Sequence, residues 1–233
     1  MTIAKFWTLL LLALTTSSQW AVVTARKVDD ADGLVTCGSA IKLTHMESKT
    51  STGEEHYLNS EGKNLGSGSG QQIVTAVTSP TTINTLWWIR GPNDPERHGA
   101  EAACTKGVAE PIACGSVIRL SHLDSLRNLH SHNVRSPLSR QQEVSAYGEG
   151  DGKGDNGDDW RVVCTGKYWE RSAAVALQHV DTQKFLGASS TVKFTHQNCG
   201  HNCPILNHLE VFARTQKDNF ALWVVEMGVH ISK

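Results

Sequence analysis

The chain repeats one short stretch, and this repeat decides the fold. Residues 35–45 read VTCGSAIKLTH, and residues 112–122 read IACGSVIRLSH. A weaker third copy runs over residues 162–179, where an insertion separates the cysteine from the final histidine. Repeats of this kind are structural units that bury their apolar faces only by packing on one another. We therefore expect three related units.

Two more landmarks recur in the same order in each unit. Glutamine-containing segments at residues 70–74 and 140–144 match each other, with a looser match at 208–211. Each unit then closes on a tryptophan, and three of these are predicted to occupy equivalent buried positions: Trp88, Trp160 and Trp223. The predicted units are 34–92, 111–161 and 162–230, which together form one domain over residues 34–230.

The periodicity within each unit is that of a β-strand. Apolar Ile118 and Leu120 alternate with polar neighbours, which is typical of a half-buried strand. Four strands per unit, or about twelve in all, are expected, because no stretch sustains a helical pattern over three turns. A closed threefold arrangement removes exposed sheet edges, whereas the alternative, a linear solenoid, would need polar capping repeats. The predicted fold class is therefore all-β with pseudo-threefold symmetry.

Composition and charge exclude several classes of protein. Of the 233 residues, 39% are hydrophobic and 19% are charged, which fits neither a disordered chain nor a membrane protein with many spans. The formal net charge is -1 at pH 7. Such a chain cannot gain affinity by releasing counterions from phosphates, so a nucleic-acid partner is not expected.

The N-terminus has the layout of a secretory signal peptide, predicted over residues 1–25. Lys5 precedes the apolar run 6–14, and small Val23 and Ala25 stand where signal peptidase reads. The alternative is an uncleaved anchor, but the run is too short for a bilayer, which needs about 20 apolar residues. We therefore expect entry into the secretory pathway without membrane insertion.

That compartment makes the cysteines interpretable as disulfide candidates: Cys37, Cys104, Cys114, Cys164, Cys199 and Cys203. Cys37, Cys114 and Cys164 occupy equivalent repeat positions, so we expect them to be too far apart to pair with one another. Cys104 lies in the linker before the second unit and is the expected partner for one of them. A local bond between Cys199 and Cys203 is favoured over a zinc site, because the neighbouring histidines interleave with these cysteines in an unusual spacing.

Two further segments contain candidate ligands. His130 and His132 share one face if their segment is a strand, and such a pair could bind metal, sense pH or hydrogen-bond a ligand. No carboxylate or cysteine stands near them in the sequence at ligand spacing, so the favoured interpretation is polar hairpin residues. The acidic segment 149–159 fails the EF-hand template and is predicted to be a solvated hairpin loop.

No catalytic constellation is found in the sequence. It contains no Gly-x-Ser-x-Gly, no His-Glu-x-x-His and no Cys-x-x-Cys motif. We therefore expect no enzyme activity, no catalytic residues, no bound metal and no cofactor. Hairpin loops presented by rigid strands suit recognition instead.

Several motifs together resemble the stromal-cell-derived factor 2 family, which is built of three MIR motifs. They are the repeated Cys-Gly-Ser-x-Ile-Lys/Arg-Leu-x-His and the segments 66–72, 128–132, 136–139 and 142–148. The resemblance implies a β-trefoil, in which three hairpins cap a six-stranded barrel. It also implies residence in the endoplasmic reticulum with a BiP-type lumenal chaperone and its J-domain co-chaperone. The C-terminal residues 229–233 lack the Lys/His-Asp-Glu-Leu retrieval signal of animal members, so retention is expected to depend on a partner.

The expected function is that of a non-enzymatic subunit of a chaperone complex in protein folding and quality control. The alternative is a secreted, lectin-like trefoil, for which glycans or O-mannosylated clients are the candidate ligands. The contact surface is predicted on the hairpins of the second unit, at residues 128–132 and 141–146. Its candidate binding residues are His130, His132, Gln141, Gln142 and Glu143.

Overall fold

The structure, a computed structural model, describes residues 33–79 and 83–230, so the predicted signal peptide lies outside it. The strands in these residues are β1 (Ser39–His45), β2 (Tyr57–Asn64), β3 (Gln72–Val77), β4 (Trp87–Arg90), β5 (Val117–His122), β6 (Asn128–Arg135), β7 (Gln142–Tyr147), β8 (Trp160–Val163), β9 (Ala176–His179), β10 (Phe185–Lys193), β11 (Leu209–Arg214) and β12 (Trp223–His230). The α-helices are α1 (Met46–Thr52), α2 (Pro95–His98) and α3 (His196–Cys199). None of the helices in this part of the chain has the length and apolar character that a membrane span requires.

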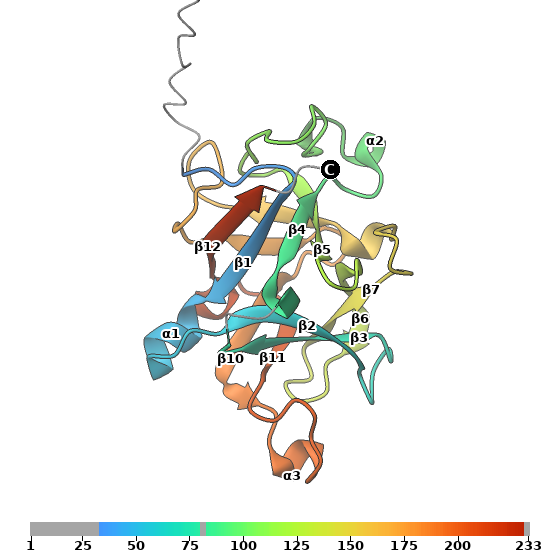
Figure 1. The fold of residues 1–233 in the computed structure, drawn as a ribbon, viewed down its shortest axis with the longest axis vertical. Helices are drawn as coiled ribbons and strands as arrows, with labels where there is room; N and C mark the ends of the chain where they lie inside the picture. Colours follow the sequence, from blue (N-terminus) through green and yellow to red (C-terminus); the bar gives the residue numbers. More distant parts are fainter. Residues whose placement is uncertain (1–32, 80–82, 231–233) are drawn as a thin grey trace, which may run out of the picture.

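Half of the strands form a closed barrel. β1 pairs with β4, β4 with β5, β5 with β8 and β8 with β9. β12 pairs with β1, and a bridge between Val175 and Trp223 completes the ring. In Figure 1, β12, β1, β4 and β5 lie side by side in the upper part of the molecule.

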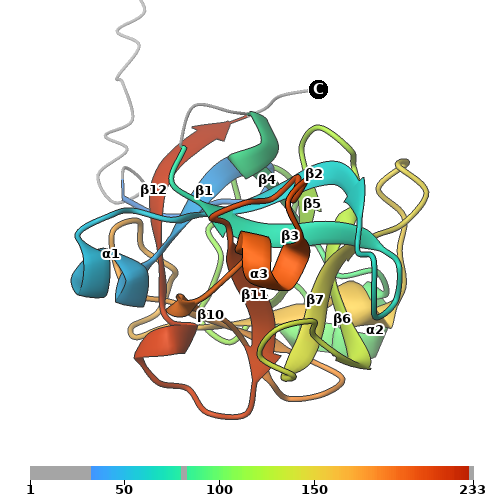
Figure 2. The same ribbon diagram turned by 90° about the horizontal axis from the view of Figure 1, so that it is seen from below.

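The remaining strands form three hairpins that cap the barrel: β2–β3, β6–β7 and β10–β11. One strand of each hairpin pairs with the next hairpin, since β3 pairs with β7, β7 with β11 and β11 with β3. Seen from below, these three strands surround the centre of the molecule, with α3 in front of them (Figure 2). A barrel capped by three hairpins is a β-trefoil, so the predicted fold is confirmed.

A buried tryptophan links barrel and hairpin in each unit. The indole N–H donates to a backbone carbonyl on the first hairpin strand: Trp87 to Leu58 at 3.0 Å, Trp160 to Leu129 at 2.8 Å and Trp223 to Leu186 at 3.1 Å. The expectation for Trp88 is wrong, because Trp87 occupies the buried position in the first unit. Neighbouring side chains of a strand point to opposite faces, so Trp88 is half-buried on the other face of β4, under the guanidinium of Arg90.

A histidine from the following unit packs on each tryptophan. The ring centroids of the pairs lie 4.9–5.2 Å apart: His122 on Trp87, His179 on Trp160 and His45 on Trp223. In each case Nδ1 accepts a backbone N–H and Nε2 faces a backbone carbonyl. Burial lowers the pKa of both His45 and His179 to about 4, so these histidines are neutral at physiological pH. Neutral imidazoles therefore connect the units around the barrel.

The cysteines form three disulfides, Cys37–Cys104, Cys114–Cys164 and Cys199–Cys203. The first and third agree with expectation. The expectation that Cys164 lies too far from Cys114 is wrong, because their Cα atoms are 5.3 Å apart. Cys37 and Cys114 each precede a strand-ending histidine by eight residues, and Arg171 stands at that position before His179. Cys164 therefore follows β8 and is not the third-unit equivalent of Cys114.

The acidic segment 149–159, predicted to be a solvated hairpin loop, connects β7 to β8. It is exposed at Glu149, Asp151 and Asp155, as expected, but its end is buried. Asp158 and Asp159 are fully buried. The carboxylate of Asp159 accepts the backbone N–H of Asn93 at 3.1 Å and lies 2.8 Å from Nε2 of His98. A short 3₁₀ turn, Asn156–Asp158, directs these side chains inward, because Asp155 caps its start.

Candidate functional site

A polar hollow of about 520 Å³ lies over the second hairpin, beside the turn that joins β9 to β10. Its lining combines imidazole, carboxamide, phenol and carboxylate groups, among them Gln71, His130, His132, Tyr147, Asp155 and Asp181. The segments that supply them belong to all three units of the trefoil, so only the folded chain assembles this set.

Strand β6 places His130 and His132 in this hollow. Because the side-chain period of a strand is two, residues 130 and 132 point to the same face, as the sequence predicted. Their rings meet edge to face, with centroids 5.0 Å apart and Nε2 of His130 3.0 Å from Nδ1 of His132. His130 is buried, whereas the side chain of His132 is 29% exposed. The pair therefore extends from the protein interior to the hollow.

Carboxylates reach both ends of this pair from outside β6. Nδ1 of His130 lies 2.9 Å from Oδ1 of Asp158 and 3.5 Å from Oδ1 of Asp155. At the other end, Nε2 of His132 lies 3.5 Å from Oε1 of Glu143 on β7. The histidines thus have the carboxylate neighbours that sequence spacing did not reveal.

Asp158 is held rigidly beneath His130. Its Oδ2 accepts hydrogen bonds from Nδ2 of Asn128 at 3.1 Å and from the backbone N–H of Asp155 at 2.9 Å. Burial raises the pKa of Asp158, although the hydrogen bonds and His130 oppose that shift. At the exposed side, burial and the neighbouring His130 lower the pKa of His132. The sequence contained one indication that Asp155 holds a defined position in the fold. Like Asp218 in the third unit, it stands five residues before the tryptophan that closes its unit.

The five predicted binding residues do not form one surface. Gln142 is buried, and its Nε2 donates to Ser131 Oγ and Thr182 Oγ1, each at 2.8 Å, so it joins the second hairpin to the third unit. Glu143 is buried and accepts both the backbone N–H and the hydroxyl of Ser69 in the first hairpin loop. Gln141 lines a separate hollow of about 480 Å³. Only His130 and His132 face the polar hollow.

The histidine–carboxylate set occurs in one unit of the three. Strand registers align Ser60, Ser131 and Ala188 of the three hairpins. The equivalents of His130 are therefore Asn59 and Gly187, and those of His132 are Glu61 and Ser189. The trefoil symmetry thus supplies the scaffold, whereas the paired histidines occur on the second hairpin. In the first hairpin, Glu61 stands at the position of His132 and lies 3.7 Å from Nδ1 of His208.

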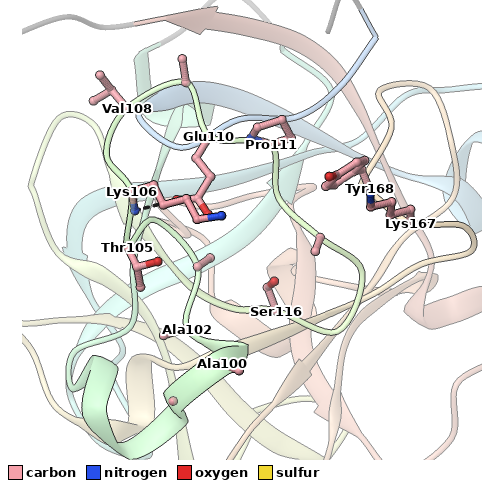
Figure 3. Close-up of a pocket in the computed structure, with 14 residues that line it drawn as sticks. Ala100, Ala102, Thr105, Lys106, Val108, Glu110, Pro111, Ser116, Lys167 and Tyr168 are labelled. Carbon is pink, nitrogen blue, oxygen red and sulfur yellow. Dashed lines mark hydrogen bonds between the residues drawn. The ribbon is translucent and has the colours of Figure 1, made fainter. Parts of the chain in front are cut away.

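A larger hollow of about 720 Å³ lies in the linker between the first two units (Figure 3). Figure 3 shows Lys106 and Glu110 on one side and Lys167 and Tyr168 on the other. The carboxylate of Glu110 accepts the backbone N–H of Lys106 at 2.9 Å. Much of the lining is alanine and glycine, and it includes neither histidine nor cysteine. The polar hollow is the stronger candidate, because it gathers coupled ionisable groups.

The chain matches known proteins over most of its length. A family model described as the MIR domain matches residues 33–201. Stromal cell-derived factor 2-like protein 1 of Mus musculus is 41% identical over 199 residues, which are 85% of this chain and 79% of that protein. Stromal cell-derived factor 2 of Homo sapiens is 40% identical over 210 residues, covering 90% and 86% of the two chains.

Solved structures agree with the fold. The SDF2-like protein from Arabidopsis thaliana superposes with a TM-score of 0.69 at 32% identity, covering 85% of this chain and 97% of that one. A Caenorhabditis elegans protein of unknown function superposes with a TM-score of 0.70 at 35% identity, covering 84% of this chain and 97% of that one. A chain of the S. cerevisiae protein O-mannosyltransferase complex bound to the sugar donor superposes with a TM-score of 0.67 at 25% identity. The match covers 85% of this chain and 26% of that one.

Proposed function

Because this chain belongs to the stromal cell-derived factor 2 family and carries its MIR domain, we propose that it is a non-enzymatic subunit of a chaperone complex in the lumen of the endoplasmic reticulum. Its proposed partners are a BiP-type chaperone and its J-domain co-chaperone, and the complex acts in protein folding and quality control. The three disulfides support an oxidising compartment of this kind.

The observation that carries the proposal is the polar hollow on the second hairpin, whose chemistry the other two hairpins do not share. Tyr147 contributes an aromatic ring that is 39% exposed and lies 4.8 Å from the ring of His130. Binding energy at protein interfaces is concentrated in a few residues, among which tyrosine is enriched. We propose that Tyr147 is the central contact of the partner-binding surface.

The test is affinity capture from microsomes with the purified, disulfide-bonded protein and its Tyr147→Ala variant. The wild type should recover the chaperone and its J-domain partner. The variant should lose at least about tenfold in apparent affinity, which corresponds to the ~1.4 kcal/mol or more expected of an interface hot spot. Equal recovery by both proteins would place the interface elsewhere.

A matched control is Val108→Ala, which shortens an exposed apolar side chain beside the linker hollow. Val108 is 65% exposed and lies outside the second hairpin. This variant should capture both partners like the wild type, and both variants should melt like the wild type. If Val108→Ala also reduces capture, the decisive surface is the linker hollow.

The same hollow supports glycan binding as a second candidate function. Tyr147 offers a ring face, and Gln71 and Asp181 offer an amide and a carboxylate in the same lining. Aromatic faces with a few placed polar groups are typical of small-ligand sites. Elution of captured clients by free mannose would support this alternative, whereas recovery unaffected by mannose would favour the chaperone complex.

A further inference from the structure

We propose that His130, Asp155 and Asp158 form a binding site for a divalent transition-metal ion of the zinc class. The three residues each offer one donor atom, and these atoms all lie within 4.8 Å of one another. A single imidazole nitrogen with two carboxylate oxygens is a donor set that suits zinc. This site goes beyond the proposed function and does not depend on which partner binds the protein.

The donor atoms all lie within 4.8 Å of one another, and two of their separations are close to those of a zinc site. Nδ1 of His130 lies 2.9 Å from Oδ1 of Asp158 and 3.5 Å from Oδ1 of Asp155. In a tetrahedral zinc site with bonds of ~2.0–2.2 Å, neighbouring donor atoms lie ~3.3–3.6 Å apart. Small movements of these side chains therefore admit the ion. Calcium fits poorly, because it takes 6–8 oxygen ligands at longer distances.

Glycine at position 157 lets the chain pass close to two of the donors. A Cβ atom there would overlap Cε1 of His130 and lie 2.8 Å from its Nδ1, so a larger residue would collide with this ring. His130 and Asp155 both line the polar hollow. Three protein ligands leave a fourth position on the ion, which water from this hollow would fill.

The contacts beyond His130 resemble the outer contacts of a metal-bound imidazole. They run from Asp158 to His130, from His130 to His132 and from His132 to Glu143, with separations of 2.9, 3.0 and 3.5 Å. Nε2 of His132 is buried without a hydrogen-bond partner among the described residues, and it lies 3.5 Å from Oε1 of Glu143.

A cation at Nδ1 of His130 is compatible with these contacts. With the ion on Nδ1, the ring hydrogen of His130 stands on Nε2, which lies 3.0 Å from Nδ1 of His132. Metal-bound histidines usually donate their second N–H in this way, and the outer partners fix the ring. Asp158 is likewise held by Asn128 through its other oxygen. The outer hydrogen bonds of a metal site are thus already in place.

The local charge also favours a cation. Asp155 and Asp158 bring two carboxylates to one imidazole, and Glu143 adds a third at the end of the chain. Within residues 33–79 and 83–230, the ion pairs of Asp155 and Asp158 are with His130, not with lysine or arginine. Arg119 acts on Asp158 only through space, since its guanidinium donates to Gly91, Asn93 and Gly152.

Calorimetric titration of the purified, chelator-treated protein with zinc chloride tests the proposal. The wild type should bind one zinc ion, and Asp155→Asn should weaken that binding at least about tenfold, the loss typical of even an outer partner. Asparagine preserves the cap that Asp155 gives the backbone N–H of Gly157, so the loop should keep its fold. Absence of zinc binding by the wild type, or equal binding by the variant, would overturn the proposal.

Two controls separate this site from others on the chain. Asp151→Asn removes an exposed carboxylate from the same loop and should bind zinc like the wild type. His201→Gln breaks the exposed pair His196–His201, whose ring centroids lie 6.0 Å apart, and should also bind like the wild type. Loss of binding in either control would contradict the assignment.

X-ray absorption of the zinc-loaded wild type keeps the test valid if Asp155→Asn fails to fold. The proposed site predicts one imidazole and otherwise oxygen ligands in the first shell of the ion. Two imidazoles would indicate the pair beside α3 instead and would refute the site at His130.

Discussion

Acidification should destabilise this trefoil through its buried inter-unit histidines, and His45 is the clearest case. His45 is fully buried, its Nδ1 accepts the backbone N–H of Ser48, and its Nε2 faces the carbonyl of Phe220 at 3.1 Å. Burial lowers its pKa from 6.5 to about 4. The unfolded chain therefore binds this proton more readily than the folded chain, so stability present above pH 6.5 is lost as the pH falls toward 4.

The magnitude follows from these two pKa values. Between pH 7 and pH 4.5, His45 alone should reduce the free energy of unfolding by about 2 kcal/mol. Urea unfolding at both pH values should show this loss in the wild type, together with contributions from other groups. His45→Gln cannot titrate, so its loss over the same interval should be smaller by about 2 kcal/mol.

An exposed histidine serves as the matched control for this measurement. His196 in α3 is exposed and lies outside the inter-unit contacts. His196→Gln leaves His45 in place and should therefore keep the loss of about 2 kcal/mol that His45 contributes. If His45→Gln shows the same pH dependence as the wild type, the folded structure accepts the proton at His45, and the reasoning from burial fails.

Three further perturbations test the packing by urea unfolding. Trp160→Ala should cost ~3–5 kcal/mol, because the fully buried indole fills the core; a loss under ~1 kcal/mol would contradict its burial. Replacing Cys37 and Cys104 together by serine should cost ~2–5 kcal/mol, more than removing the disulfide beside α3, which closes a far shorter loop. Gly68→Ala should lower the free energy of unfolding more than Gly70→Ala. Both glycines have positive φ, but only at Gly68 would the new methyl group meet the buried carboxylate of Glu143. Equal losses in the two variants would refute that contact.

The fold was predictable because its determinants repeat. The strand-ending histidines and the closing tryptophans recur in each unit, and each makes the same contact with a backbone group of a neighbouring segment. Each of these contacts joins one side chain to a backbone group. Only that one residue type has to recur at the same place in each unit for the contact to be predictable. The choice between Trp87 and Trp88 could not be made in this way, because both belong to one four-residue strand and differ only in the face they occupy.

The disulfide Cys114–Cys164 was missed for a related reason. The insertion after β8 shifts the third repeat, so Cys164 resembles the repeat cysteines in local sequence without sharing their place in the fold. Alignment of short motifs across an insertion cannot tell which side of it belongs to the repeat. Only the register of β8 with β9 resolves that question.

The histidine pair of the candidate site was predictable from the sequence, whereas its carboxylate partners were not. The spacing of His130 and His132 implied a shared face, because β periodicity is local. Their partners were not predictable, since Asp158 reaches His130 across 28 positions of sequence and only because a short turn directs it inward. The roles of Gln142 and Glu143 were not predictable for the same reason. Their side chains contact residues of other units, which are distant in the sequence.

The separation of scaffold from site explains how one hairpin can carry distinct chemistry. Two of the hairpin loops are held by a glutamate of the neighbouring unit: Glu143 binds the first loop, and Glu210 binds the second through the backbone N–H groups of Leu138 and Ser139. Asn59 and Gly187 stand at the equivalents of His130 in the other two hairpins, so the trefoil fold does not require histidine at this position. Asp155→Asn, at the exposed edge of the histidine–carboxylate set, should accordingly alter ligand binding more than it alters the fold.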